Sequence, residues 1–375
     1  MAERNWRLVV EHNPYTDFSI SVSPAVERAV ALGEAPPTVL LNVFDRDSIT
    51  IGVNEDPLQV VDMEYCRAEG IEVRRRVNGG GAIYAGAGSV FMCFYLPTAL
   101  EGVPQTAREA FPQVLSSVAR TLEARYGFPA RYRPLNDVEV DGRKLMPTSV
   151  KIEDGVMTLR VLLNVCAIDA DVAAKALPMP PEKVKDKVHK ELKSRYTWLE
   201  REAGRTIAPD ELETVIRQVT ADAFGSVALE AGTLTAFERE TAERLAAELG
   251  SDDWLFGKSE HALFGPLKPG ETILRGRAKA VGGLIWAALK LRDGVVSRAI
   301  VNGDWHPRPT DSVAWLEAAL AGCPAQGPAI EERVRAVLAR EDVEFAGIEP
   351  EDLMAAFEKA LAGMESDDAS ALQRS

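Results

Sequence analysis

Val-Arg-Arg-Arg-Val-Asn-Gly-Gly-Gly-Ala-Ile-Tyr-Ala-Gly-Ala-Gly-Ser, residues 73–89, is the stretch from which the rest of this chain is best interpreted. Its arginines stand at the end of a predicted strand, and Gly79, Gly80 and Gly81 follow them. Glycine permits positive φ and close approach of a ligand to the main chain, and successive amides in such a turn form a nest for an anion. On the glycines alone we favour an irregular hairpin with surface arginines, because short glycine-rich matches are common. An anion-binding loop is the alternative.

The composition is that of a globular protein with room for two domains. The chain has 375 residues, of which 46% are hydrophobic and 27% charged, and this length is sufficient to bury a large core. The formal net charge of -14 argues against a general binder of nucleic acid or of an anionic membrane. We therefore expect no nucleic-acid partner and no membrane partner, although a local basic patch remains compatible with this charge.

Cysteine and histidine usage predicts neither a metal site nor a disulfide framework. The four cysteines and four histidines are widely separated, at Cys66, Cys93, Cys166, Cys323, His12, His189, His261 and His306, and none has the spacing of a zinc site. The N-terminus lacks the apolar stretch of a signal peptide, and no run approaches the ~18 residues of a membrane span. These features predict a reduced, cytoplasmic protein.

The first 249 residues predict one mixed domain of strands and helices. Ser23-Pro24 is a typical helix start, with a capping hydroxyl followed by proline. We expect strands at 6–11, 38–44, 48–53, 71–75, 89–96, 130–133, 138–140, 144–152 and 156–165, and helices at 23–32, 62–69, 106–126, 171–176, 182–192, 209–224 and 234–249. Cys93 lies inside an apolar strand, where a buried core thiol is favoured over a nucleophile.

A second domain is predicted from residue 250 onward. Residues 250–253 are the best linker candidate, and three strands at 272–281, 284–291 and 295–301 read as a meander. Helices at 312–320, 329–339 and 350–364 complete a small α+β unit. The expected domains are therefore 1–249 and 250–364, with 365–375 as a disordered tail.

The second informative stretch, residues 135–144, combines an amide, a carboxylate and a lysine. Asn136 and Asp137 lie before a tight turn, and Lys144 leaves that turn into a predicted strand. A carboxylate such as Asp137 holds Mg²⁺ together with substrate phosphates, and Lys144 is placed to stabilise charge on a carboxylate, phosphate or acyl-adenylate. Alone, this segment reads as a surface hairpin.

The two stretches occur together in the order used by one family. Arg75-Arg76-Val77-Asn78-Gly79-Gly80-Gly81-Ala82-Ile83-Tyr84 resembles the Arg-Arg-x-Ser-Gly-Gly-Gly-Ala-Val-Tyr of the lipoate–protein ligase A family, within the biotin and lipoate ligase superfamily. Asn136-Asp137 and Gly142-Arg143-Lys144 match its Asn-Asp and Gly-Arg-Lys. Further similar segments are Asn13-Pro14-Tyr15, Pro36-Pro37-Thr38, Ile51-Gly52, Lys187, Ser194-Arg195-Tyr196-Thr197, Trp254-Leu255-Phe256-Gly257, Gly282-Gly283 and Gly303-Asp304.

The resemblance implies a fold and a two-step reaction. The fold is an α+β catalytic domain with a mixed sheet, followed by a small α+β accessory domain that rotates between steps. A lipoate-like carboxylic acid attacks the α-phosphate of ATP, giving an acyl-adenylate and pyrophosphate, and a lysine of a carrier domain then displaces AMP. By the resemblance, Lys144 is catalytic and Asp137 assists through Mg²⁺. Substrate and adenylate are bound by Arg76, Asn78, Gly79, Gly80, Gly81, Tyr84, Asn136 and Lys187.

The chain departs from the family where that family lines its acyl pocket. Where the family has Tyr-His-Asp, this chain has Tyr84-Ala85-Gly86. Residues 145–149 replace the family's x-Ser-Gly-Ser-Ala, and residues 157–160 replace its His-His-Gly-Thr. Ser21-Val22 replaces a pair of glutamates. Met146, Pro147 and Leu159 are expected to add bulk beside the acyl chain, and Arg160 adds a cation that points either inward or outward.

Three interpretations stay open. The chain is an acyl-adenylating ligase for another acid such as octanoate or biotin, a strict lipoate ligase, or a non-catalytic relative that binds a nucleotide or a carrier. Because Arg76, the glycines, Asp137 and Lys144 are all present, we favour an enzyme; a cysteine acyltransferase is disfavoured for want of an activated thiol. The locally basic run from Lys183 to Arg195 is either a solvated helix face or a docking surface for an acidic carrier domain.

Overall fold

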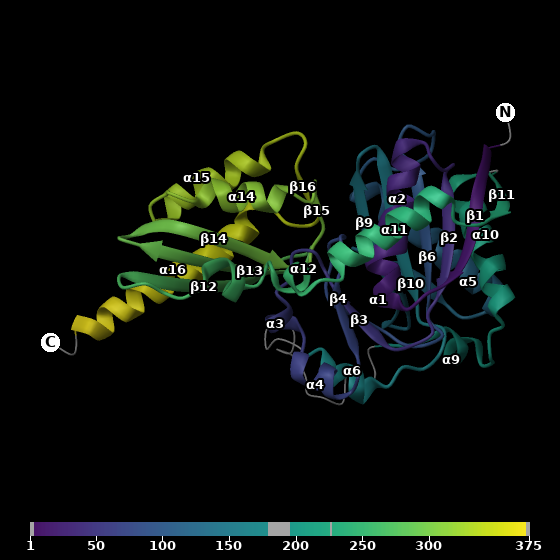
Figure 1. Ribbon diagram of the computed structural model, residues 1–375, viewed down its shortest axis with the longest axis horizontal. Helices are drawn as coiled ribbons and strands as arrows, with labels where there is room; N and C mark the ends of the chain where they lie inside the picture. Colours follow the sequence, from purple (N-terminus) through teal and green to yellow (C-terminus); the bar gives the residue numbers. More distant parts are fainter. Residues whose placement is uncertain (1–3, 179–195, 226, 373–375) are drawn as a thin grey trace. The chain divides into compact units, whose positions relative to one another are not determined.

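The structure is a computed structural model that describes residues 4–178, 196–225 and 227–372. The chain divides into two compact units (Figure 1). The first comprises Met1–Ile51, Val60–Asn78 and Ala82–Trp254, and the second Gly52–Gln59, Gly79–Gly81 and Leu255–Ser375. The second unit thus begins at residue 255 rather than 250 and takes in two short segments from the N-terminal half, which no local sequence pattern marks.

A mixed eight-stranded sheet forms the centre of the first unit. Its order is β11-β1-β2-β6-β10-β9-β8-β7. Neighbours pair in parallel from β11 to β2 and antiparallel from β2 to β7. The bounds are β1 Arg4–His12, β2 Thr38–Val43, β6 Val90–Pro97, β7 Ala130–Arg133, β8 Asp137–Val140, β9 Arg143–Glu153, β10 Val156–Leu163 and β11 Val227–Gly232. The expected α+β class and mixed sheet are confirmed.

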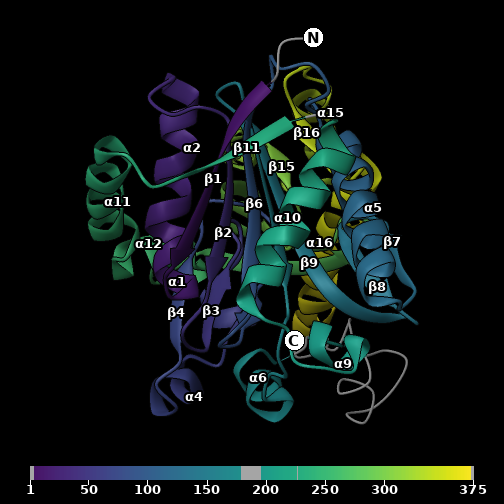
Figure 2. The ribbon, with the colours of Figure 1, turned by 90° about the vertical axis from the view of Figure 1, so that its right-hand side faces the viewer.

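Helices cover both faces of this sheet. Figure 2 shows α2 (Ser23–Leu32) and α11 (Ala236–Leu249) on one side, with α5 (Ala107–Tyr126) and α10 (Pro209–Phe224) on the other. Strands covered on both faces need apolar residues at consecutive positions, and β10 is buried along its whole length. The remaining short helices of this unit are α1 Tyr15–Asp17, α4 Met63–Ala68, α6 Ala170–Ala176 and α9 Leu199–Ala203.

Strand register assigns side chains to the two faces. Arg160 of β10 lies opposite Cys93 of β6 and Ser149 of β9, and Pro147 lies opposite Asp137 of β8. Cross-strand partners share a face, and residues two apart along a strand share one as well. Asp137, Pro147, Ser149, Cys93 and Arg160 therefore lie on one face, which we call the α2 face because α2 packs on it through an aromatic and aliphatic core.

The helix predicted at Ser23 begins earlier than its capping signature suggests. The chain is helical from α1 through a π-helical segment, η1 (Phe18–Val22), into α2. The backbone N–H of Ser23 donates to Phe18 O, and this wider turn precedes Pro24, which has no N–H to donate. Ser23 is therefore no helix cap; its hydroxyl accepts a hydrogen bond of 2.8 Å from Tyr95 Oη. The predicted stop at Gly33 is confirmed, with φ of 73°.

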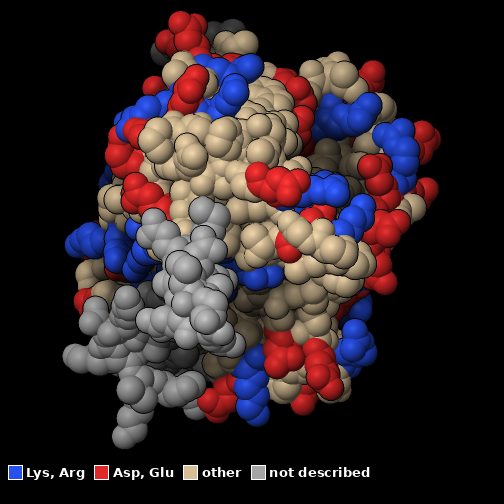
Figure 3. Space-filling view, turned by 90° about the vertical axis from the view of Figure 1, so that its left-hand side faces the viewer, with Lys and Arg blue, Asp and Glu red and all other residues tan. Residues whose placement is uncertain are grey.

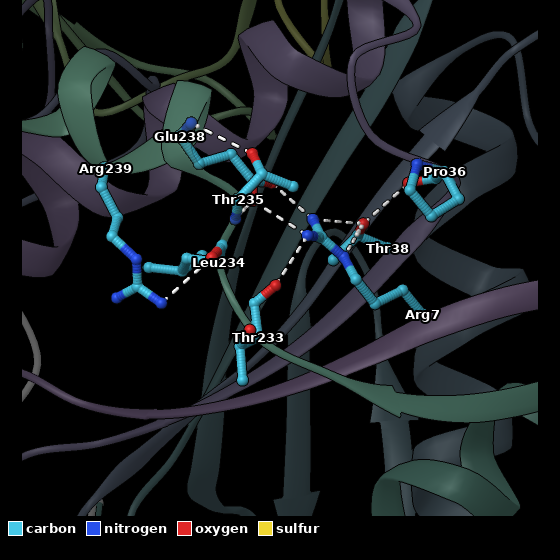
Figure 4. Close-up of polar contacts among 8 residues, drawn as sticks. All are labelled: Arg7, Pro36, Thr38, Thr233, Leu234, Thr235, Glu238 and Arg239. Carbon is cyan, nitrogen blue, oxygen red and sulfur yellow. Dashed lines mark hydrogen bonds and ion pairs between the residues drawn. The ribbon is translucent and has the colours of Figure 1, made fainter.

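A buried ion pair attaches β1 to α11 in the first unit. Arg7 contacts both carboxylate oxygens of Glu238, at 2.9 Å from Nη1 to Oε2 and by a shorter contact from Nη2 to Oε1. Arg7 also donates to Thr38 Oγ1 at 2.9 Å from Nη2 and to Thr233 O at 3.1 Å (Figure 4). Glu238 in turn accepts from the backbone N–H of Thr235, which caps α11. Every charge in this cluster has a partner.

A small three-stranded sheet, also in the first unit, positions the arginine stretch. Its order is β4-β3-β5, with bounds Glu72–Arg75, Ser48–Ile51 and Ile83–Ala85. Strand β4 pairs with β3 in parallel, and Arg76 continues the pairing by donating its N–H to Ile51 O at 3.0 Å. The arginines therefore do stand at the end of a strand, as the sequence predicts.

The second unit is built on a three-stranded antiparallel sheet, which confirms the expected meander. The strands are β12 Glu271–Lys279, β13 Leu284–Arg292 and β14 Val295–Gly303. Their core packs against α14 Ser312–Leu320, α15 Gly327–Leu338 and α16 Pro350–Leu372. The remaining elements are β15 Pro307–Arg308, β16 Glu344–Phe345 and α13 Glu260–Phe264, while α3 Pro57–Val60 and α12 Asp252–Phe256 span the division between units.

Two expectations at the ends of this unit are wrong. The linker candidate 250–253 runs into α12, because Asp252 and Asp253 begin that helix. Helix α16 continues to Leu372, so residues 365–372 are helical where a disordered tail was expected. None of the helices that the structure describes is long and apolar enough to cross a lipid bilayer.

Candidate active site

Lys144 and Asp137 form the ionic centre of the candidate site. Lys144 Nζ lies 2.8 Å from Asp137 Oδ2, and the side chains are 31% and 13% exposed. A bulge in the β8–β9 pairing, between Val138 and Glu139, changes the register just after Lys144, and bulges re-aim side chains beside active sites. The structure therefore brings together the two residues predicted to be catalytic and metal-binding, and Lys144 remains accessible to a substrate.

The backbone of Lys144 is held by the segment that follows residue 195. Thr197 donates its N–H to Lys144 O at 2.9 Å, and Tyr196 forms a parallel bridge with Lys144. Arg143 is fixed by Glu202, with Nη2 at 3.1 and 3.2 Å from its two carboxylate oxygens. Lys187, predicted to bind substrate, and the basic run from Lys183 to Arg195 lie outside the described residues.

Asn136 serves the architecture around this ion pair. Its Nδ2 donates to Thr148 O at 2.8 Å, which links the start of β8 to β9. The second carboxylate oxygen of Asp137, Oδ1, is buried and has no hydrogen-bond partner among the described residues. Since an unpartnered buried oxygen is costly, this atom is ready to accept a ligand.

Arg76 and Asn78 are both buried in the first unit, each about 1% exposed. Arg76 Nη1 donates to Thr50 O at 3.2 Å, and Thr50 Oγ1 donates to Tyr15 Oη at 2.5 Å. Both polar atoms of the Asn78 side chain lack a hydrogen-bond partner among the described residues. An amide left unpaired in this way has donors and acceptors available for a substrate.

The triple glycine belongs to the second unit. Gly80 donates its N–H to Trp305 O at 3.0 Å, and a Cβ on Gly79 would lie 2.6 Å from the same oxygen. A Cβ on Gly81 would lie 3.1 Å from the Asp304 side chain. The glycines thus permit close packing within the second unit, and the Gly80 amide is engaged there.

Tyr84 and its neighbours pack tightly in the first unit. Tyr84 Oη donates to Asp47 Oδ2 at 2.5 Å, and burial together with this hydrogen bond raises the pKa of the phenol. Ala85 is fully buried, and a Cβ on Gly86 would lie 2.4 Å from the Ile168 side chain. The two departures from the family pattern at 85 and 86 therefore occupy positions where larger side chains have no room.

Two residues expected to fill the acyl pocket lie on the other side of the sheet. Met146 pairs with Val138, and Leu159 pairs with Val150. Met146 and Leu159 occupy the alternate positions of their strands. Their side chains therefore lie on the face opposite the α2 face, which carries Pro147, Ser149 and Asp137. Of Met146, Pro147 and Leu159, only Pro147 therefore shares a face with Asp137.

Arg160, whose direction the sequence left undecided, is fully buried on the α2 face. Its guanidinium lies over the Phe91 ring, with Cζ 5.4 Å from the ring centroid. Nη1 is 3.5 Å from Ser23 Oγ, and Nε and Nη2 have no hydrogen-bond partner among the described residues.

Three of the cysteines are buried, and Cys166 is partly exposed. Burial raises the pKa of Cys66 to about 11 and that of Cys93 to about 12. Burial also raises the pKa of Cys166 and Cys323, and nearby Glu200 adds to the effect at Cys166. Because the thiolate is the nucleophile, none of the four is activated at neutral pH.

On the face of the molecule drawn in Figure 3, the described Lys and Arg side chains lie among Asp and Glu side chains. Neighbouring charges of opposite sign cancel at a distance. That face therefore presents a mixed surface rather than a field of one sign.

The comparisons with known proteins agree with this fold. The family "Lipoyl protein ligase A/B catalytic domain" matches residues 18–221, more than half of the chain, and the chain belongs to that family. It is 27% identical over 279 residues to the octanoyltransferase LipM of Kyrpidia tusciae, covering 68% of this chain and 100% of the relative. It is 24% identical over 326 residues to lipoate–protein ligase 1 of Staphylococcus aureus, covering 86% and 92%.

Among solved structures, a lipoate–protein ligase A bound with ATP superposes with a TM-score of 0.58 at 20% identity, covering 68% of this chain and 99% of that one. This likeness concerns the fold. Family membership makes the chain a lipoyl or octanoyl transfer enzyme by class, and its relatives divide between ligases and octanoyltransferases.

Proposed function

We propose that this protein is an ATP-dependent ligase that activates a lipoate-like carboxylic acid as an acyl-adenylate and transfers the acyl group to a lysine of an acidic carrier domain. The observation that carries the proposal is the partly exposed Lys144 ammonium, 2.8 Å from Asp137 Oδ2 on a fixed backbone. A positioned cation of this kind stabilises negative charge that develops on a phosphate or an acyl oxygen.

In the first step, a carboxylate oxygen of the acid forms a bond to the α-phosphorus of ATP, and the bond from that phosphorus to pyrophosphate breaks. Lys144 neutralises charge on the α-phosphate oxygens and holds the acid in line. Asn78 offers an unpartnered amide from the same unit, and Arg76 adds a buried guanidinium. In the second step, the carrier lysine nitrogen attacks the acyl carbon, AMP leaves, and the nitrogen loses a proton.

The residues present fit a magnesium ion at Asp137. Mg²⁺ is commonly held by one or two carboxylates together with substrate phosphates, and Asp137 Oδ1 is a buried oxygen without a partner among the described residues. When bound, the ion would neutralise phosphate charge. Asp137 would therefore hold the metal through Oδ1 and the Lys144 ammonium through Oδ2.

An octanoyltransferase is the second candidate, because the K. tusciae relative bears that name. A transferase that works through a covalent acyl-thiol intermediate needs a cysteine with a lowered pKa. Every cysteine of this chain instead has a raised pKa. This observation favours the ligase.

ATP–pyrophosphate exchange with a panel of lipoate, octanoate, biotin and shorter or aromatic acids tests the proposal. We expect exchange with at least one acid, and we expect Lys144→Ala to abolish it while the circular dichroism spectrum is unchanged. Lys151→Met is the matched control: it removes another lysine of β9, whose partner is Glu27 at 2.6 Å, and should retain exchange.

The alternatives give different results. Octanoyl transfer from a thioester donor without ATP, with no exchange for any acid, would establish the transferase. A folded protein with neither activity would indicate the non-catalytic relative that binds a nucleotide or a carrier. Exchange with octanoate or biotin but not lipoate would identify a ligase for a different acid.

A further inference from the structure

Arg160 is a buried charged residue that has no role in the proposed reaction. It is 0% exposed, and charged side chains are almost never buried to this degree unless they are paired. Its Nε and Nη2 have no hydrogen-bond partner among the described residues, and no ion pair of Arg160 is found among them either. Among the described residues its one polar contact, to Ser23 Oγ at 3.5 Å, is at the limit of a hydrogen bond.

An arginine side chain carries a permanent positive charge in proteins. The surroundings of Arg160 are Phe91, Cys93 and Tyr95, which belong to the apolar core of the α2 face. A buried ion without a counter-charge is strongly unfavourable, so the structure points to an anion that completes this site.

The position of Arg160 relates it to the candidate active site. Arg160 and Asp137 lie on the same face of the sheet, and Arg160 stands opposite Ser149. From Lys144 to Ser149 the strand runs for about 17 Å at about 3.4 Å per residue. An acid that engages both Lys144 and Arg160 must therefore be an extended molecule.

Aromatic rings link Arg160 to the region of Arg76. Tyr15 receives a hydrogen bond from Thr50, which also accepts from Arg76. The Tyr15 ring centroid is 5.2 Å from that of Phe91, and Phe91 lies beneath Arg160. The surroundings of Arg160 on this side are therefore apolar, which suits the hydrocarbon part of a substrate.

We infer that Arg160 binds the distal carboxylate of the substrate, so that the acid activated here is a linear dicarboxylic acid or a similar acid with a second anionic end. The inference rests on the proposed function and specifies its substrate class. Arginine pairs with carboxylate through two parallel N–H···O bonds, and Nε and Nη2 are the two donors that such a fork uses. The reacting carboxylate would stay at Lys144.

The test compares acids of matched length in ATP–pyrophosphate exchange with the full-length protein. Each linear dicarboxylic acid is paired with the monocarboxylic acid that ends in a methyl group. We expect the dicarboxylic acid to have a kcat/KM roughly tenfold or more above its partner, as the loss of a charged hydrogen bond costs about this factor. Equal rates, or a preference for the monocarboxylic acid, would overturn the inference while leaving the ligase intact.

Two variants make the assignment specific. Arg160→Thr, which introduces the residue of the family's His-His-Gly-Thr pattern, should remove the preference for the dicarboxylic acid. Lys151→Met should retain it, since Lys151 is a paired cation on the same face. A preference that survives Arg160→Thr would assign the distal carboxylate to another residue and refute the role of Arg160.

A binding measurement separates this inference from the proposed function. Calorimetric titration of Lys144→Ala with the dicarboxylic acid alone, without ATP, needs no turnover. We expect binding that Arg160→Met weakens roughly tenfold or more. If no acid supports exchange but this binding is seen, the ligase proposal fails and the anion site stands; if dicarboxylic and monocarboxylic acids bind alike, the anion site fails.

Discussion

Arg7 and Arg160 are both buried in the first unit, but among the described residues only Arg7 has a carboxylate beside it. Arg7 contacts both oxygens of Glu238 and also donates to Thr38 and Thr233. Arg160 has one long contact to Ser23 and an aromatic ring beneath it. The charge of Arg7 is paired within the protein, whereas Arg160 has donors without a partner among the described residues.

This difference separates a structural arginine from a binding arginine. An ion pair that is complete within the fold fixes the elements that carry it, here β1 and α11. A guanidinium with unused donors contributes no such bond and carries the cost of its burial. A fold retains such a group when another molecule supplies the missing charge, and the following predictions examine both halves of the comparison.

Removing the carboxylate of Glu238 should have the largest effect on stability. Glu238→Leu leaves Arg7 as an uncompensated buried charge, and breaking a buried pair in this way costs about 3–5 kcal/mol. Urea denaturation should therefore show a strongly reduced free energy of unfolding. The double variant Arg7→Met, Glu238→Leu should recover most of the loss, because it removes both charges; a double variant as unstable as Glu238→Leu would show that packing, and not charge, is responsible.

Replacing Arg160 should raise the free energy of unfolding. Arg160→Met removes a buried charge that has no counter-charge among the described residues, so the free energy of unfolding without ligand should rise by about 1–4 kcal/mol. Arg160→Lys keeps the charge and serves as the matched control, which should show no such gain. A decrease in stability with Arg160→Met would mean that Arg160 is already satisfied in the free protein, and the comparison with Arg7 would then lose its meaning.

Local patterns predicted most of the elements of both units, and topology accounts for the rest. Helix α10 and the stop of α2 at Gly33 follow the sequence pattern because caps and periodicity are local signals. Strand β11 was missed, since its residues 227–232 are half exposed and become a strand by pairing with β1 in parallel. The bounds of α2, Ser23–Leu32, match the prediction, but the helical residues before it were not predicted, because Ser23-Pro24 has the pattern of a helix start.

The candidate site likewise contains residues that local patterns predicted and residues that they did not. Lys144 and Asp137 were predicted from neighbouring motifs, and one hairpin with a bulge brings them together. The direction of Arg160 was unpredictable, because alternation along β10 leaves both faces open until the register with β6 and β9 is known. The same register places Met146 and Leu159 on the other face. Gly80 donates to Trp305 O, more than two hundred residues away in the chain. No local sequence pattern predicts a contact of this kind.

Lys144 should show the smallest effect on stability, in contrast to its effect on activity. The Lys144–Asp137 pair is partly exposed, at 31% and 13%, and ion pairs of this kind contribute about 0–1 kcal/mol. Lys144→Ala should therefore lower the free energy of unfolding by about 1 kcal/mol or less while exchange is lost. Urea denaturation of Lys144→Ala beside Glu238→Leu measures both pairs on one scale. A loss at Lys144 as large as that at Glu238 would make Lys144 a structural residue like Arg7, and its loss of exchange would then reflect unfolding.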